Sequence, residues 1–186
     1  MINFYSLFII TCFLVMAIIW VATAFSAKRV ARKSGGWILR IIFYATIVLF
    51  IYLQKNIDFL TISLWSKTGT TYIVADVVTF AGLLVMLWAR INLGKNWSAN
   101  IVIKENHKLI TSGPYAYVRH PIYSGLILMV LGIVLYVDTL GWLIFFIAFF
   151  FGAYYKAQKE ERILINYFPD YLEYKNKVKT LIPFIF

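Results

Sequence analysis

The chain has 186 residues, of which 62% are hydrophobic and 19% aromatic, and its mean hydropathy is +0.78. This composition excludes a soluble globular domain and predicts an integral membrane protein. A formal net charge of +10 would suit a nucleic-acid-binding protein. The basic residues are instead sorted by loop, which is the pattern that membrane topology produces.

Five apolar segments are long enough, or nearly so, to cross a hydrocarbon core that is roughly 30 Å thick. They are residues 4–25, 38–54, 72–91, 123–137 and 140–155. The last two are short and joined by a few residues, which predicts a tight helical hairpin. The expected fold class is therefore an all-α integral membrane protein with about five transmembrane helices.

The distribution of positive charge predicts the orientation in the membrane. All lysines and arginines except Lys55 and Lys67 lie around the first and third loops or after the fifth segment. Because basic loops stay in the cytoplasm, five spans place the N-terminus outside and the C-terminus in the cytoplasm. The single cysteine, Cys12, has no partner for a disulfide within the chain.

The third loop, residues 92–122, is long and aromatic, so we expect it to be ordered and to cap the inner face. Residues 101–104 and 109–111 resemble short extended pieces, with residues 105–108 as the turn between them. The loop ends at a His-Pro pair. Pro121 moves His120 out of the α region and suits the first turn of a helix, so His120 should lie at a helix mouth, where unpaired N–H groups suit an anionic or electron-rich ligand group.

The residues after the fifth segment predict two C-terminal helices. Lys156, Glu160 and Tyr167 share one face of an amphipathic helix that begins after the apolar run. Pro169 should end it, and a second short helix over residues 171–178 should lie on the cytoplasmic interface. Glu161 has the simple interpretation of a solvent-exposed residue.

Several polar side chains could meet on the inner face. Each has a structural explanation when taken alone, such as a helix ion pair, but their density near one end of the predicted hairpin indicates a site. The set is His107, Tyr115, Arg119, His120, Tyr123, Lys156, Glu160 and Glu161. Two histidines thirteen residues apart without a second cysteine make a poor zinc set, so we expect no metal. The common nucleotide-binding and hydrolase motifs are absent from the sequence.

Four motifs follow one another in the second half of the chain. They are Gly94-x-Asn96-Trp97-Ser98, His107-x-Leu109-Ile110-x-x-Gly113-x-Tyr115, Arg119-His120-Pro121-x-Tyr123-x-Gly125, and Glu160-Glu161 followed by Phe168-x-x-Tyr171-x-x-Tyr174. In this order and spacing the chain resembles the isoprenylcysteine carboxyl methyltransferase family and, more loosely, the membrane phospholipid N-methyltransferases. The first three apolar segments resemble the family only in hydropathy.

The resemblance implies a multi-span enzyme that binds S-adenosylmethionine and methylates a lipophilic or lipidated acceptor arriving from the bilayer. It divides the chain into a membrane region, 1–91, and a cofactor-binding and catalytic region, 92–186, within one integrated unit. Membrane lipids are the other expected partners, and nucleic acid is not expected. The implied cofactor-binding residues are His107, Lys108, Leu109, Ile110, Tyr115, His120, Pro121, Ile122, Tyr123 and Glu160.

One departure concerns the methyl acceptor. The family usually carries an arginine four residues before the cofactor glutamate, where it is thought to hold the acceptor carboxylate, and this chain has Lys156 there. The lysine ammonium is a point charge, whereas the planar guanidinium of arginine can donate two hydrogen bonds to one carboxylate. The replacement therefore weakens the case for a carboxylate acceptor. The resemblance therefore implies an acceptor-side catalytic role for Lys156, with Arg119 as a further candidate.

Three other functions stay open at this point. One is a phospholipid-type N-methyltransferase, and another is an NADPH-dependent membrane reductase, for which we find no phosphate-binding residues. The third is a non-enzymatic membrane protein. The acceptor and the oligomeric state are left undetermined.

Overall fold

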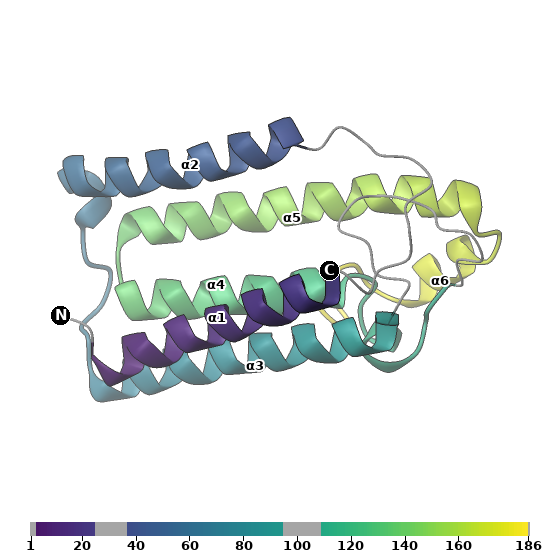
Figure 1. Ribbon diagram of the computed structural model, residues 1–186, viewed down its shortest axis with the longest axis horizontal. Coiled ribbons are helices and arrows are strands. Elements are labelled where there is room, and N and C mark those ends of the chain that lie inside the picture. The colour runs from purple at the N-terminus through teal and green to yellow at the C-terminus, as the bar shows by residue number, and fades with distance from the viewer. Residues whose placement is uncertain (1–2, 25–36, 95–108, 186) are drawn as a thin grey trace.

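A computed structural model describes residues 3–24, 37–94 and 109–185, and within these residues the chain is helical (Figure 1). Five long helices run alongside one another as a bundle, and a short sixth helix follows at one end. They are α1 (Phe4–Ala24), α2 (Trp37–Asn56), α3 (Gly69–Leu93), α4 (Pro121–Val137), α5 (Leu140–Tyr167) and α6 (Tyr171–Lys177), with 3-10 turns η1 (Asp58–Thr61) and η3 (Gly113–Ala116). The expected all-α class is confirmed.

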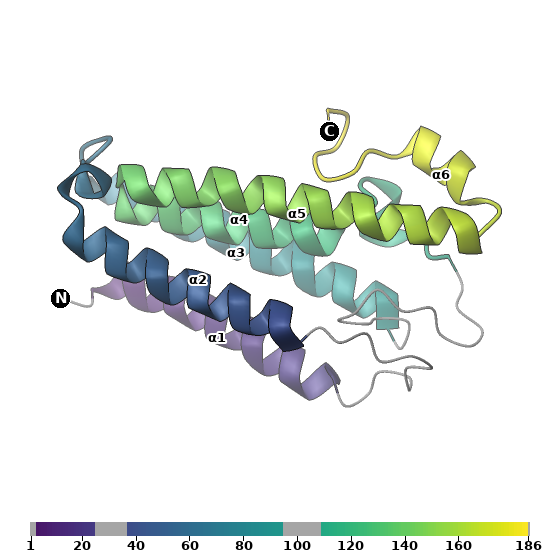
Figure 2. The same ribbon diagram turned by 90° about the horizontal axis from the view of Figure 1, so that it is seen from above.

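Three of the described helices are long and apolar enough to cross a membrane: α1, α3 and α5. The fourth, α4, is apolar but has only 17 residues. A view at right angles places α1 and α2 on one side of the bundle, and α6 with the residues after it on the other (Figure 2). The number of five spans therefore stays a prediction, although each of the five expected segments falls on a helix.

The tightest packing joins α3 to α4, because glycines on both helices let their backbones approach. A Cβ built on Gly82 of α3 would lie 2.5 Å from the carbonyl oxygen of Gly125 on α4. A Cβ on Gly132 would lie 1.9 Å from the hydroxyl oxygen of Thr79. Small residues at helix crossings are the usual route to close packing in membranes. Beside this crossing, Cys12 brings α1 into the same buried core.

The fifth helix is longer than the sequence suggested. The apolar segment 140–155 and the amphipathic helix after it are one continuous helix, α5, because residues 156–162 are strong helix formers and nothing in them interrupts the backbone hydrogen bonds. The helix ends before Pro169, as predicted, and α6 matches the second short helix.

The expected extended pieces of the third loop have a different outcome. Residues 109–111 have no regular structure, and residues 101–104 with their turn lie outside the described residues. In residues 3–24, 37–94 and 109–185 the β pairing consists of two isolated bridges, Ser63 with Thr139 and Val118 with Lys179.

Asp138 closes the hairpin at one end of the bundle, between α4 and α5. It is fully buried and adopts a left-handed conformation with φ 66°. Its carboxylate accepts hydrogen bonds from the N–H groups of Leu64 and Trp65, at 2.9 and 2.7 Å, and from the hydroxyl of Ser63. Burial alone would raise the pKa of Asp138, but these hydrogen bonds outweigh it and lower the pKa. The connection from η1 to α3 is thereby fixed to the hairpin.

We expect Asp138→Ala to lower the free energy of unfolding by about 2 kcal/mol, because three donors lose their acceptor. Asp58→Ala, at an exposed carboxylate of η1, is the matched control and should change little. Since the folded pKa is depressed, the contribution of Asp138 is present at neutral pH and lost as the pH falls below about 4. Chemical unfolding in detergent micelles at several pH values measures both effects. Equal stability of the two variants at neutral pH would contradict this role.

Candidate active site

The turn before α4 is built by residues that favour its unusual backbone. Pro121 is the first residue of α4, and His120 precedes it with φ −126° and ψ 60°, outside the α region as predicted. At Gly113 φ is +62°, and a Cβ there would lie 2.5 Å from the side-chain oxygen of Asn92 on α3. Glycine is therefore required where the loop passes α3. His120 lies at the mouth of α4.

The residues after α6 run beside this turn and pair with its backbone. The N–H of Arg119 donates to the carbonyl of Lys179 at 2.8 Å, and the N–H of His120 donates to the carbonyl of Thr180 at 3.1 Å. Of the N–H groups expected to be unpaired at this helix mouth, that of His120 is therefore already bonded within the protein. The segment after α6 thereby holds the backbone of the turn that leads into α4.

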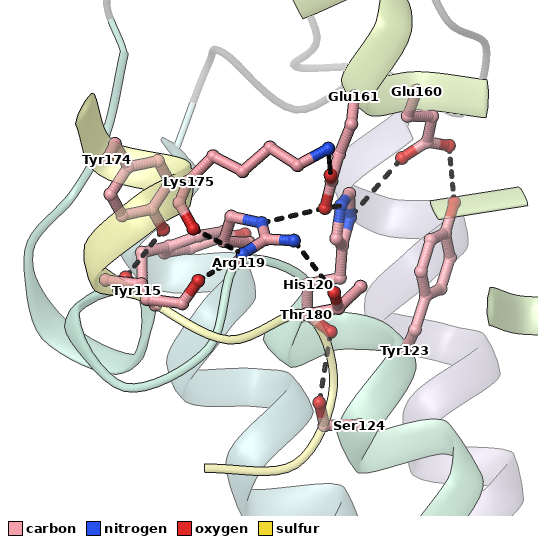
Figure 3. Close-up of polar contacts among 11 residues, drawn as sticks. Tyr115, Arg119, His120, Tyr123, Ser124, Glu160, Glu161, Tyr174, Lys175 and Thr180 are labelled. Carbon is pink, nitrogen blue, oxygen red and sulfur yellow. Dashed lines mark hydrogen bonds and ion pairs between the residues drawn. The ribbon is translucent and has the colours of Figure 1, made fainter. Parts of the chain in front are cut away.

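A buried ionic cluster joins the turn to α5 and α6 (Figure 3). The Nε of Arg119 lies 2.7 Å from Oε1 of Glu161, and the Nζ of Lys175 lies 2.9 Å from Oε2. The Glu161 side chain is 0% exposed, so its interpretation as a solvent-exposed residue is wrong. The physical reason is the continuity of α5, which carries residue 161 over the start of α4. Opposite charges are retained in such a dry place because each has a partner.

The guanidinium of Arg119 makes three further hydrogen bonds, all to residues at or after the end of α6. Its Nη1 donates to the carbonyls of Lys175, at 3.0 Å, and of Val178. Its Nη2 donates to the hydroxyl of Thr180 at 2.8 Å. Together with the bond from Nε to Glu161, these bonds use all three guanidinium nitrogens on protein partners.

Glu160, the neighbour of Glu161, points to a different and more open environment. Its Oε1 accepts a hydrogen bond from the phenol of Tyr123 at 2.5 Å, and its side chain is 23% exposed. The rings of Tyr123 and His120 are stacked, with centroids 5.6 Å apart. One helical turn earlier, the Nζ of Lys156 lies 5.3 Å from the centre of the Tyr123 ring, within cation–π range.

His120 connects the two glutamates. Its Nε2 lies 3.3 Å from Oε1 of Glu161, and its Nδ1 lies 3.7 Å from Oε2 of Glu160. The imidazole thus stands between the buried cluster and the open carboxylate (Figure 3). A displacement of the buried cluster would therefore move the His120 ring and alter the surroundings of Glu160.

Two tyrosines close the far side of the cluster. The phenol of Tyr174 donates to the carbonyl of Tyr115 at 2.6 Å. Burial raises the pKa of both phenols above the ordinary value, so both stay neutral.

The structure brings some of the predicted site residues together and separates others. Tyr123, His120, Glu160 and Lys156 form one constellation. Ile122 packs against the buried core of the bundle. Leu109 and Ile110 are half-buried beside η3, while His107 and Lys108 lie outside the described residues.

The sequence did not reveal Lys175, Ser124 and Thr180 as partners in this region. Each is a common surface residue type, and its role depends on a contact with a different helix or turn, which for Ser124 and Thr180 lies more than 50 residues away along the chain. Among the described residues no group of three or more His, Cys, Asp or Glu could hold a metal ion.

The sequence profile of the isoprenylcysteine carboxyl methyltransferase (ICMT) family matches residues 73–166, about half of the chain. The chain belongs to this family. The resemblance read from the motifs is thereby confirmed, and the matched region contains Arg119, His120 and both glutamates of the site.

Individual relatives agree with membership of the ICMT family. Protein-S-isoprenylcysteine O-methyltransferase of Schizosaccharomyces pombe is 35% identical over 101 residues, which cover 52% of this chain and 43% of the relative. The cobalt-zinc-cadmium resistance protein CzcN of Cupriavidus metallidurans is 30% identical over 121 residues, covering 63% and 54%. The chain spans about half the length of the curated relatives it matches.

A solved structure supports the fold. The eukaryotic intramembrane Ras methyltransferase ICMT superposes with a TM-score of 0.55 at 22% identity, covering 97% of this chain and 63% of that one. The likeness shows that this chain has the ICMT-like helical arrangement.

We expect Glu161→Gln to lower the free energy of unfolding by about 3 kcal/mol, because the buried Arg119 and the half-buried Lys175 would lose their carboxylate partner. The matched control is Glu173→Gln, which removes an exposed ion pair with Lys177 on α6 and should leave stability unchanged. Chemical unfolding in one detergent, followed by circular dichroism, gives both values. Indistinguishable unfolding of the two variants would show that the buried cluster does not hold the fold.

Proposed function

We propose that this ICMT-family chain is an S-adenosylmethionine-dependent methyltransferase acting on a lipophilic acceptor, with carboxyl O-methylation of a prenylated cysteine as the first candidate reaction. Family membership supports the reaction class. The observation that carries the assignment to a site is the constellation of Glu160, Tyr123 and His120 at the mouth of α4. Because the chain spans about half the length of its curated relatives, the identity of the acceptor is a separate proposal.

The donor set fits S-adenosylmethionine chemically. Glu160 is part-exposed, its Oε1 accepts from the Tyr123 phenol, and its Oε2 lies 3.7 Å from Nδ1 of His120, which leaves Oε2 able to accept from an ammonium or a ribose hydroxyl. The stacked His120 and Tyr123 rings offer π faces or edges for the adenine or the sulfonium. We propose that Leu109, Ile110 and Tyr115, on the segment leading into α4, complete the site with His107 and Lys108.

S-adenosylmethionine supplies a methyl group on a positively charged sulfonium. The protein's task in such a displacement is to align donor and acceptor and to exclude water, rather than to move protons. A site at the end of an apolar bundle favours the exclusion of water. Glu160 and Tyr123 would fix the donor, and the apolar faces of α4 and α5 would guide a lipid acceptor toward it.

Arg119 and Lys156 have different surroundings, and we assign them different roles. The guanidinium of Arg119 is buried and bonded to Glu161 and to the segment after α6, so we propose that it positions His120. Lys156 is exposed and lies one helical turn before Glu160, toward the apolar part of α5. We propose that Lys156 contacts the acceptor headgroup.

We further propose five spans with the N-terminus outside and the site on the cytoplasmic face. The structure places the η1 connection and the α4–α5 turn at one end of the bundle, and α6 at the other (Figure 1). Lys55 and Lys67 flank the η1 connection, and the remaining basic residues belong to the other loops and the C-terminal region. This division supports the orientation.

Wild-type protein should bind S-adenosylmethionine and be stabilised by it in a thermal-shift assay, whereas NADPH should have no effect. We expect Glu160→Ala to weaken cofactor affinity by tenfold or more, since a hydrogen bond to a charged group is worth about 1.5–3 kcal/mol. Glu173→Ala on exposed α6 is the control. Calorimetry measures the affinities, and an unchanged affinity in the Glu160 variant would remove it from the cofactor site.

Variants of Lys156 identify the acceptor class. Lys156→Ala should lower turnover while leaving cofactor affinity nearly intact, and Lys159→Ala, also exposed on α5, is the matched control. With a prenylcysteine carboxylate as acceptor, Lys156→Arg should preserve or raise turnover, because a guanidinium binds a carboxylate through two donors. An amine acceptor such as a phosphatidylethanolamine headgroup gains nothing from the change. Transfer of labelled methyl groups to both acceptors is the assay, and unchanged turnover in both Lys156 variants would exclude this role.

Cysteine labelling tests the orientation. A cysteine at Ser66, near the η1 connection, should react with an impermeant reagent in intact cells, whereas a cysteine at Ser34 should react only after lysis. The native Cys12 is buried and gives little background. The reverse pattern would invert the topology.

A further inference from the structure

The residues that follow Thr180 turn back toward the bundle. We call Leu181–Ile185 the hook. Its first residue is fixed to α4, since the hydroxyl of Ser124 donates to the carbonyl of Leu181 at 2.6 Å. Ser124 belongs to the first turn of α4, so the hook begins at the depth of that turn. Figure 1 shows the chain running from α6 back to the start of α4.

The hook presents apolar side chains that nothing in the described structure covers. Leu181 is only 2% exposed and attaches the hook to the protein. Phe184 and Ile185, by contrast, are 89% and 74% exposed. Ile182 is also exposed, so the outward side of the hook is apolar. Adjacent exposed side chains of this kind mark a surface that has a partner.

The depth of α4 in the membrane identifies that partner. The helix is apolar along its 17 residues, from Pro121 to Val137. At 1.5 Å per residue it spans about 26 Å, close to the thickness of the hydrocarbon core, so its first turn lies at the boundary with the headgroups. A segment fixed at this depth meets lipid at the boundary rather than bulk water.

The charges next to the hook agree with this placement. Lys177 and Lys179 are exposed and lie just before it in the chain. This order, with cations first and then apolar side chains, matches the headgroup layer followed by the acyl-chain layer. Lys175 is turned inward to Glu161 and belongs to the buried cluster instead.

We infer that the hook is an interfacial membrane anchor, in which Phe184 and Ile185 enter the bilayer beside the start of α4. Its partner is the lipid bilayer itself. Since Lys179 and Thr180, just before the hook, accept the N–H groups of Arg119 and His120, the lipid contact would also support the turn that carries the site. The inference rests on depth and exposure and does not depend on the proposed methyl transfer.

Spin labels test the anchor directly. Single cysteines at Phe184 and at Ile185, each in a Cys12→Ala background, are labelled, and the protein is placed in phospholipid nanodiscs. Collision rates with apolar oxygen and with a water-soluble nickel chelate report the depth of each label. Ile147→Cys, on the apolar face of α5, and Asn176→Cys, on exposed α6, are the lipid and water references. Both test positions are exposed, so the labels should not disturb the fold, and unchanged melting temperatures verify this.

Labels at positions 184 and 185 should collide with oxygen as the Ile147 label does and be shielded several-fold from nickel relative to the Asn176 label. Collisions with nickel as frequent as those at Asn176 would place the hook in water and overturn the inference. Shielding from both reagents would show that protein covers the hook, such as a second copy of the chain, and would overturn it equally. The experiment needs no cofactor, so its outcome is separate from that of the proposed activity.

Discussion

The buried ion pair between Arg119 and Glu161 is the interaction on which the site depends. It joins three segments that are far apart in sequence: the turn before α4, the extension of α5, and the residues after α6. A carboxylate with 0% exposure can remain charged there only because Arg119, Lys175 and His120 surround it. Removing Arg119 or Glu161 would leave a buried charge without its partner, and removing the residues after α6 would take hydrogen-bond acceptors from Arg119.

This arrangement divides the two adjacent glutamates between two tasks. Successive residues of a helix point about 100° apart, so Glu161 faces the protein while Glu160 faces the open side next to Tyr123. The division explains how an ionic cluster can hold the fold without occupying the carboxylate proposed for the cofactor. His120 lies close to both glutamates, so the position of its ring, and with it the surroundings of Glu160, depends on the buried cluster. At the other end of the hairpin, Asp138 plays a comparable structural part by accepting donors from the η1 connection.

The sequence predicted the parts of this structure that depend on local patterns. Apolar length predicted the helices, and Pro121 predicted both the start of α4 and the backbone of His120. The motif order predicted the family, and therefore the end of the molecule at which to look for the site. These features are encoded within a few residues of one another.

Contacts between distant segments could not be predicted in the same way. Taken alone, Glu161 had the simple interpretation of a solvent-exposed residue, and its burial depends on the turn before α4 and on α6, which supply Arg119 and Lys175. The hydrogen bond from the N–H of His120 to the carbonyl of Thr180 joins residues that are 60 positions apart, and neither residue type indicates its partner. The continuity of α5 was missed because the change from apolar to charged residues marks a change of environment, not the end of a helix.

Hydrogen exchange at the amides of Arg119 and His120 tests the central claim most directly. Both N–H groups bond to carbonyls of the segment after α6, and the account holds that the Arg119–Glu161 pair keeps that segment in place. In Glu161→Gln these two amides should exchange much faster than in wild type, while amides of the α3–α4 crossing keep their protection. Unchanged exchange at Arg119 and His120 in a folded Glu161→Gln protein would contradict the account.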